Sequence, residues 1–393
     1  MEHLFSDRVQ QVKASEIREI LKLTQMPDII SFAGGLPAPE LFPIEALKNV
    51  ASVVLDEMGK EALQYSTTEG YDPLRSKIAA RMIRAGVKAT KDDILITSGS
   101  QQGLDFSGKI FINPGDYVLC ESPSYLGAIN AFKAYQSAFK EVKTDHEGMD
   151  LADLETVIQD TPNAKFIYVI PDFQNPSGRT WSLERRKGIV EIANRYNLVI
   201  IEDNPYGELR FEGETIASIK SFDTEGRVIY LGTFSKTFSP GIRIGFVLAA
   251  PTLLNKYILV KQGADLQSST LSQRELNQYL EMYDFDAHIA KIREVYKKRR
   301  DLMMETIREA FPASAKCEVP QGGLFAWVEL PKHIDTKALL IKAVENKVAF
   351  VPGGSFFPNG GQENYMRLNF SNMPEEKIVE GIQRLGKIIK ESL

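Results

Sequence analysis

The sequence predicts an α/β fold, with a mostly parallel central sheet covered by helices and a smaller α+β domain. Three observations lead to this prediction. In the middle of the chain, short apolar runs alternate with helical patterns, the order that builds a parallel sheet. Residues 286–393 instead combine one long helical stretch with short strand-like runs. The chain of 393 residues is 43% hydrophobic and 25% charged, which is typical of a soluble globular protein with more than one domain.

The central elements are assigned from apolar runs and their spacing. Residues 183–196 repeat apolar side chains on one helical face, so they predict a helix between two strands. Continuous apolar runs bounded by polar or glycine-rich stretches predict buried strands. These strands are residues 94–96, 166–170, 198–201, 228–231 and 244–248. Ligands of such sheets bind beyond the carboxyl ends of the strands, so the polar residues that follow each strand are candidate site residues.

The C-terminal part predicts a different architecture. Residues 286–310 form one long helix rich in lysine and arginine, which we interpret as a solvated helix face rather than a nucleic-acid patch, because acidic residues interleave. A strand at 324–329, a helix near 336–346 and a Pro/Gly-rich stretch at 352–361 follow. We therefore expect a large domain at residues 51–289. Residues 1–50 and 290–393 are expected to form an N-terminal arm plus a small C-terminal domain.

Composition and absent motifs narrow the function classes. A formal net charge of −5 gives no electrostatic reason to bind nucleic acid or anionic lipid. The two cysteines, Cys120 and Cys317, indicate a reducing, cytoplasmic setting, and we expect neither a secretory signal nor a membrane span. The scattered histidines show no metal-binding spacing, and no dinucleotide, P-loop or serine-hydrolase motif is present.

Four polar clusters follow predicted strands. Residues 97–103 (TSGSQQG) open a predicted helix, where backbone N–H groups with Ser100 and Gln101 form an anion cradle. Helix capping by Ser98 or Ser100 is the local alternative. Residues 171–178 (PDFQNPSG) place an asparagine before a proline, where its amide donates a directed hydrogen bond. An ordinary turn-rich loop explains the same residues.

The other two clusters carry charge. Residues 202–206 (EDNPY) put an acid directly after a buried strand, where it needs a cationic partner such as a protonated ring nitrogen. A helix-capping aspartate is the alternative. Residues 232–243 (GTFSKTFSPGIR) place Lys236 among hydroxyl side chains and before Arg243, a set that can hold phosphate. Burial near a cation lowers the pKa of a lysine and favours Schiff-base chemistry, whereas a surface lysine in a turn is the local alternative.

Together the four clusters fit one ligand. It carries a phosphate, a basic ring nitrogen, a phenolic oxygen and a carbonyl that condenses with lysine. Pyridoxal 5′-phosphate (PLP) has all four groups, so the sequence predicts PLP as the cofactor and no metal. The joint pattern is much more specific than any single cluster.

Motifs along nearly the whole chain resemble those of fold-type I PLP-dependent aminotransferases of class I/II. The Ser-Lys pair with a downstream arginine is specific for this superfamily. Residues 31–37 (SFAGGLP) are typical of the branch with 2-aminoadipate (LysN-like) and kynurenine/aminoadipate aminotransferases. The resemblance implies a fold-type I PLP transferase and a homodimer with shared active sites. The matching segments are 15–18, 31–37, 64–66, 98–102, 174–176, 203–206, 235–236, Arg243 and Arg367.

The resemblance also implies roles around the cofactor ring. Lys236 condenses with the cofactor aldehyde and later moves the proton between the substrate Cα and the cofactor. Asp203 pairs with the ring nitrogen and keeps it protonated. Asn175 and Tyr206 hydrogen-bond the phenolic oxygen. Tyr125 stacks on the ring, a buried core tyrosine being the alternative.

At the phosphate, the resemblance implies five ligands from three segments: Ser100, Gln101, Thr233, Ser235 and Arg243. Related enzymes often have serine where Thr233 stands, and threonine keeps the hydroxyl. Tyr65 is expected to reach the phosphate of the neighbouring subunit, which requires a homodimer. Local packing is the alternative for this tyrosine.

Substrate recognition is implied for five residues. Arg367 is expected to clamp the α-carboxylate with its bidentate fork beside Asn175, and a surface ion pair is the alternative. Gly34 and Gly35 let the backbone approach the substrate closely. Arg18, on a predicted N-terminal helix, matches the arginine that meets a distal carboxylate in the aminoadipate branch; an exposed helix arginine is the alternative.

The predicted function is ping-pong aminotransfer in amino-acid metabolism. An L-amino acid, either 2-aminoadipate or one of a broad set with aromatic and branched-chain donors, gives its amino group to the cofactor, and 2-oxoglutarate then receives it. Other fold-type I enzymes, namely a C–S lyase, a decarboxylase or an aldolase, stay open because the fold supports them all. A PLP-sensing regulator needs a helix-turn-helix domain before residue 31, and a nicotinamide dehydrogenase needs the missing glycine fingerprint. No nucleic-acid or membrane partner is expected.

Overall fold

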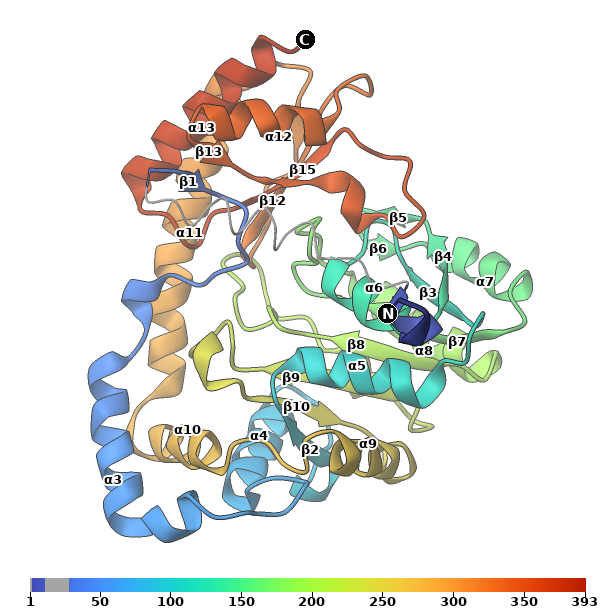
Figure 1. Ribbon diagram of the computed structural model, residues 1–393, viewed down its shortest axis with the longest axis vertical. Coiled ribbons are helices and arrows are strands. Elements are labelled where there is room, and N and C mark those ends of the chain that lie inside the picture. Colours follow the sequence, from blue (N-terminus) through green and yellow to red (C-terminus); the bar gives the residue numbers. More distant parts are fainter. Residues whose placement is uncertain (1, 11–27) are drawn as a thin grey trace.

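A computed structural model describes residues 2–10 and 28–393 of the chain and contains a seven-stranded sheet at its centre (Figure 1). Strand β10 runs antiparallel to both of its neighbours, β2 and β9, and the five strands from β9 to β4 pair in parallel with one another. The predicted mostly parallel sheet is therefore confirmed. Its order is β2 (Ile94–Thr97), β10 (Gly245–Leu248), β9 (Val228–Thr233), β8 (Val199–Asp203), β7 (Ala164–Val169), β3 (Tyr117–Glu121) and β4 (Ala138–Val142).

Helices pack on both faces of this sheet, which explains why its strands read as continuous apolar runs rather than alternating ones. All residues of β2 and β10 are buried. Apolar clusters form on both faces: along β2 and β10, Leu95 and Val247 belong to one cluster, and the adjacent Ile94 and Phe246 belong to another on the opposite face. The surrounding helices are α3 (Ile44–Ala62), α4 (Asp72–Arg84), α5 (Ser100–Phe111), α6 (Leu126–Lys133), α7 (Leu151–Gln159), α8 (Leu183–Arg195), α9 (Pro251–Ala264) and α10 (Thr270–Met282).

A second, antiparallel sheet lies beyond the carboxyl ends of the central strands. It has the order β11 (Lys316–Cys317), β12 (Phe325–Glu329), β15 (Tyr365–Asn369) and β14 (Val351–Pro352). It packs with α11 (Phe285–Ala310), α12 (Thr336–Glu345) and α13 (Glu375–Lys390). The N-terminal strand β1 (Ile30–Ser31) pairs in parallel with β13 (Val348–Ala349). The predicted division at residues 51–289 stays a prediction.

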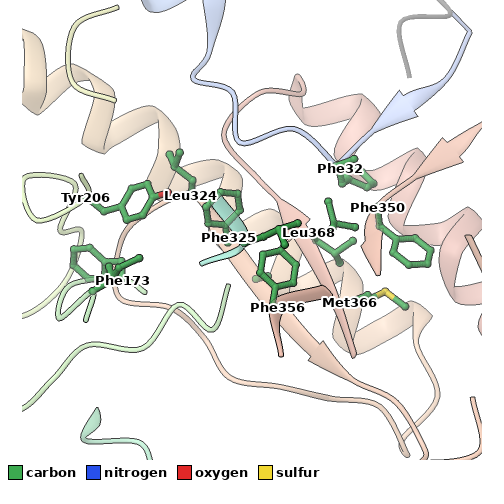
Figure 2. Packing of buried hydrophobic residues seen from close by; sticks show 14 of the residues in the cluster. Phe32, Phe173, Tyr206, Leu324, Phe325, Phe350, Phe356, Met366 and Leu368 are labelled. Carbon is green, nitrogen blue, oxygen red and sulfur yellow. The ribbon is translucent and has the colours of Figure 1, made fainter. Parts of the chain in front are cut away.

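One continuous apolar cluster joins the two sheets. Figure 2 shows its path from Phe350 and Met366 through Leu368 and Phe325 to Tyr206. The rings of Tyr206 and Phe325 meet edge to face, with centroids 6.0 Å apart. This contact joins the first residue of β12 to the segment that follows β8.

The lysines and arginines of α11 were predicted to form a solvated face, and this holds for only part of the helix. Arg299 and Arg300 are buried, and they pair with Glu40 and Glu212 on other segments. Arg299 also donates to the Ser371 carbonyl and Arg300 to the Pro320 carbonyl, so the two arginines join α11 to segments distant in sequence. Solvent exposure holds for Lys291, Lys297 and Lys298. Within residues 2–10 and 28–393, no helix is long and apolar enough to span a membrane.

Candidate active site

A cavity of about 380 Å³ lies between the carboxyl ends of the central strands and the second sheet. It brings together twelve of the fifteen predicted site residues: Gly35, Ser100, Gln101, Tyr125, Asn175, Asp203, Tyr206, Thr233, Ser235, Lys236, Arg243 and Arg367. Four further lining residues were not predicted: Ile170, Pro205, Pro240 and Phe325. Ile170, Pro205 and Pro240 fall within or beside the predicted clusters. Only Phe325 comes from a distant strand that carried no polar signal.

Asp203 is the last residue of β8 and is 1% exposed. Its Oδ2 accepts a hydrogen bond from the Tyr168 hydroxyl at 2.9 Å, whereas its Oδ1 is buried without a partner among the described residues. Burial raises the pKa of Asp203 to about 7, and the Tyr168 hydrogen bond opposes this shift. Burying an ionised carboxylate costs free energy, and a cation placed at Oδ1 would offset this cost. A protonated ring nitrogen is such a cation. The alternative of a helix-capping aspartate is wrong, because no helix follows β8 directly.

Arg367 on β15 is 2% exposed and pairs with no carboxylate in the described part of the chain. Its Nη1 donates to Asn175 Oδ1 at 2.9 Å and its Nη2 to the Ala33 carbonyl at 2.7 Å, while Nε has no partner there. The guanidinium lies 4.1 Å from the ring centre of Phe325. Burial lowers its pKa to about 10. A surface ion pair is therefore excluded, and the group is left ready for an anion from outside the chain.

Lys236 follows β9 and is half-buried against the cavity, not a surface lysine in a turn. Its Nζ donates to the Gly35 carbonyl at 2.7 Å. Burial, with Arg367 and Arg243 adding repulsion, lowers the pKa of Lys236 from 10.5 to about 8. A larger fraction of the amine is neutral near pH 7 than for a free lysine, and the neutral amine is the form that attacks an aldehyde.

We expect the rate at which the protein without cofactor attaches PLP to rise with pH up to about 8 and to level off above it. The lowered pKa of Lys236 sets this limit, since only its neutral amine reacts. Stopped-flow absorbance at constant ionic strength measures the rate. A profile that keeps rising to pH 10, as for a free lysine, contradicts the expectation.

The phosphate end of the cavity is built by backbone geometry. Gly99, at φ 79°, caps the start of α5, so the alternative of a cap by Ser98 or Ser100 is wrong. A Cβ on Gly99 would lie 2.4 Å from Arg243 Nη2, so only glycine allows this approach. Arg243 itself is left-handed, at φ 54°, and donates to the Ser98 carbonyl at 3.1 Å. Arginine thus lies at a helix N-terminus, where two separate effects favour an anion.

The remaining phosphate candidates line the same end. The hydroxyls of Thr233 and Ser235 lie 2.9 Å apart at the end of β9. The Gln101 side chain donates to the Gly127 carbonyl at 3.0 Å, which fixes the start of α6 beside that of α5. Tyr125 packs against Gly127, where a Cβ would lie 2.5 Å from the tyrosine ring. The tyrosine is partly buried: it lines the cavity and also packs against the main apolar cluster.

Three predicted residues are not in this cavity. Tyr65 is 78% exposed after the end of α3 and does not reach the site of its own chain. Gly34 is buried next to Gly35, and only Gly35 is among the described lining residues. Arg18 lies outside the described residues.

A buried network that the sequence did not reveal holds two of the site's loops together. Arg186, 0% exposed, donates to the Pro171 and Trp181 carbonyls, which form the two ends of loop 171–181. It also pairs with both carboxylate oxygens of Asp172, at 2.7 and 3.1 Å. Asp172 accepts the Asn204 amide at 2.9 Å. The network thereby joins the loop that carries the predicted amide to the end of β8.

The site therefore combines three cationic side chains with one carboxylate that no cation of the described residues pairs, where the strand ends of the central sheet face the second sheet. This arrangement suits a cofactor that carries an anionic group and a basic ring nitrogen. Comparison with known proteins agrees: residues 36–385 match the family model for aminotransferase class I and II, and the chain belongs to this family.

Named relatives span the full length of the chain. The aromatic-amino-acid aminotransferase 1 of Thermococcus litoralis is 49% identical, with 100% of this chain and 95% of that protein covered. The 2-aminoadipate transaminase of Thermus thermophilus is 43% identical, with 98% of this chain and 96% of that protein covered. The crystal structure of Pyrococcus horikoshii kynurenine aminotransferase, in complex with PMP, has a TM-score of 0.96 at 43% identity and covers 100% and 98%.

The predicted fold, cofactor and enzyme class are thus confirmed. The chain is a PLP-dependent aminotransferase, and its relatives include the aminoadipate and kynurenine enzymes that the sequence resembled. The cavity suits PLP on its own evidence, because Asp203 Oδ1 is orphaned and Lys236 has a lowered pKa.

Proposed function

We propose that this chain transfers the amino group of an L-amino acid, with 2-aminoadipate and aromatic amino acids as donors, to 2-oxoglutarate by a ping-pong mechanism. Arg367 carries this proposal: it is a buried guanidinium without a carboxylate partner in residues 28–393. A bidentate arginine of this kind matches the α-carboxylate common to every amino and oxo acid. The named relatives support the two donor classes.

The proposed roles follow the two ends of the cavity. Arg243, Ser100, Gln101, Thr233 and Ser235 hold the phosphate. Asp203 pairs with the ring nitrogen, while Asn175 and Tyr206 bond the phenolic oxygen and Tyr125 covers the ring. When bound, PLP accepts the amino group and stabilises negative charge at the substrate Cα. Lys236, whose amine is neutral above about pH 8, takes and returns the Cα proton.

The proposed assembly is a cytoplasmic homodimer in which Tyr65 of each subunit reaches the partner's phosphate. Its 78% exposure in the single chain supports this role, since a large exposed aromatic side chain is typical of an interface. Residues 51–289 are proposed as the PLP-binding domain, with residues 1–50 and 290–393 as the N-terminal arm plus small domain. In support, the cavity lining outside 51–289 is Gly35, Phe325 and Arg367. Gly34, Gly35 and Arg18 are proposed to face the substrate.

The test is an absorption titration of the PLP-loaded protein with one donor at a time and no oxo acid. Loss of the yellow PLP band with growth of a PMP band, followed by recovery on adding 2-oxoglutarate, supports both half-reactions. We expect this with 2-aminoadipate and with phenylalanine. A response to phenylalanine alone removes the acidic donor, and a spectrum that responds to neither removes the donor assignment. Release of ammonia, pyruvate or carbon dioxide without an acceptor would instead identify a lyase or decarboxylase.

Replacing Arg367 with lysine is expected to raise KM for the amino donor and for 2-oxoglutarate by roughly 10- to 100-fold, the value of one or two charged hydrogen bonds. Lysine keeps the charge but loses the fork. PLP affinity should change little, because Arg367 lies on the second sheet and not at the phosphate end. Steady-state kinetics with a fluorescence titration of PLP separates the two effects. Equal losses of PLP and donor affinity contradict the assignment.

A further inference from the structure

Lys261 on α9 is a fully buried lysine, 0% exposed, that lies outside the cavity and has no part in the proposed reaction. Its ammonium lies 2.9 Å from Gln102 Oε1, 3.0 Å from Ser268 Oγ, and 2.9 and 3.0 Å from the two oxygens of Asp265. A lysine is almost never buried unless it is paired, since an unpaired charge is costly there. Every proton of this ammonium has an acceptor, so its position is fixed from three directions.

One side of this network reaches the phosphate end of the cavity. Gln102, in the first turn of α5, accepts both the Lys261 ammonium and the backbone N–H of Ser98, each at 2.9 Å. Asp265 accepts the Gln102 amide at 2.8 Å and the Ser98 hydroxyl at 3.2 Å. The Ser98 carbonyl in turn receives Arg243 Nη2 at 3.1 Å. Lys261 thus holds the residue that anchors the phosphate-end arginine and leads into the first turn of α5.

The other side reaches the segment that carries Tyr65. The Gln267 side chain accepts the backbone N–H of Ser66, and the Thr270 hydroxyl donates to the Gln64 carbonyl at 3.3 Å. Gln267 and Thr270 lie on either side of Ser268, in the segment that follows Asp265, and Lys261 binds both Asp265 and Ser268. Helices α5 and α9 pack against each other, so the network spans their contact (Figure 1). One ammonium therefore anchors the chain's own phosphate cradle and the segment around its exposed tyrosine.

We propose that Lys261 is a positioning residue for cofactor phosphate: it holds the start of α5 and residues 64–66 in the geometry that binds this group. The inference rests on the proposed phosphate end of the site. Lys261 acts through Gln102, Ser98 and Asp265, without touching the ligand. Its removal leaves the Asp265 carboxylate without its cation and frees the turn that presents the α5 N–H groups.

The test compares two ligands that differ only in the phosphate. Apo protein is titrated with PLP and with pyridoxal, which has the same ring and aldehyde, for wild type, Lys261→Met and Lys256→Met. Lys256 is an exposed lysine on the same helix, so it is the matched control. We expect Lys261→Met to weaken PLP binding by about tenfold or more and to leave pyridoxal binding within about twofold. Lys256→Met should change neither.

Two results overturn the proposal: unchanged PLP affinity in Lys261→Met, or equal losses for PLP and pyridoxal, which indicate general disruption. Gln102→Leu is the second variant if Lys261→Met does not fold, because it cuts the link to Ser98 and keeps the Lys261–Asp265 pair. It should show the same phosphate-specific loss, and normal affinity for both ligands overturns the proposal. Sedimentation confirms that compared proteins share one oligomeric state. Wild-type aminotransfer is assayed separately, so an inactive wild type removes the proposed donors and leaves the ligand comparison standing.

Discussion

Replacing Lys236 with alanine is expected to lower aminotransfer by at least about 10⁴-fold, because both covalent attachment of PLP and transfer of the Cα proton are lost. No other lysine lines the cavity among the described residues, so no neighbour can replace its amine. The fold should survive, since the side chain makes one hydrogen bond, to the Gly35 carbonyl. Single-turnover absorbance measures the first half-reaction, and circular dichroism measures the fold. Lys256→Ala is the control, and near-normal turnover by Lys236→Ala would end the assignment.

The same variant has a defined effect on the stability of the apo protein. The pKa of Lys236 is lowered to about 8 in the folded chain, from 10.5, so the folded state binds this proton less tightly than the unfolded state. The side chain therefore costs stability below pH 8, and the cost disappears as the pH rises to 10.5. Relative to wild type, the stability of Lys236→Ala should fall between pH 8 and pH 10.5. Urea unfolding of both apo proteins at these two pH values tests the sign.

The sequence was sufficient for the polar half of the site because strand ends gather in space. Asp203 and Lys236 each follow an apolar run, and parallel strands place such ends at one edge. Arg367 could be assigned only through the resemblance, because it approaches from another sheet. The packing of Phe325 beneath its guanidinium joins two strands of that second sheet, and an apolar strand residue carries no functional signal. Its position depends on tertiary contacts that periodicity does not contain.

The sequence also could not predict the direction of a strand or the burial of particular charged side chains. An apolar run predicts a strand but not its orientation, so the antiparallel course of β10 could not be read from it. Nothing in the sequence distinguishes Arg186 or Lys261 from exposed cations, and both are fully buried. They can be buried because segments distant in sequence supply hydrogen-bond acceptors, such as the Pro171 carbonyl for Arg186 and the Gln102 side chain for Lys261. Charge on a predicted helix is therefore weak evidence for a solvated face until its partners are known.

Replacing Asp203 with asparagine is expected to make the apo protein more stable at pH 8 and the enzyme at least about 100-fold slower, the size of losing one electrostatic contact to developing charge. Asparagine keeps an oxygen to accept the Tyr168 hydroxyl. It cannot ionise, so it resembles the protonated carboxyl permanently. It also gives no negative charge to a ring nitrogen, which then binds its proton less tightly and withdraws electrons less well.

The sign of the stability change follows from the raised pKa of Asp203, about 7 in the folded chain against 3.8 unfolded. A raised pKa stabilises the fold at acid pH, and this contribution is lost as the pH rises from 3.8 through 7. The advantage of Asp203→Asn should therefore be absent at pH 4, grow to pH 7 and then stay constant, at up to about 4 kcal/mol. Bound PLP supplies the missing cation, so the advantage should vanish in the loaded protein.

Glu202→Gln is the control that separates burial from function. Glu202 is the neighbouring buried acid on β8, and burial also raises its pKa to about 7, but its two oxygens accept the backbone N–H groups of Ile219 and Lys220. Glutamine must turn its amide toward one of these donors, so Glu202→Gln should be less stable than wild type at pH 4, where both acids are protonated in the folded chain, and should keep its turnover. Asp203→Asn should match wild-type stability at pH 4 and lose turnover. Urea unfolding at pH 4 and pH 8, with and without PLP, decides between them, and an Asp203→Asn protein that is less stable at pH 8 or fully active contradicts the role of this carboxylate.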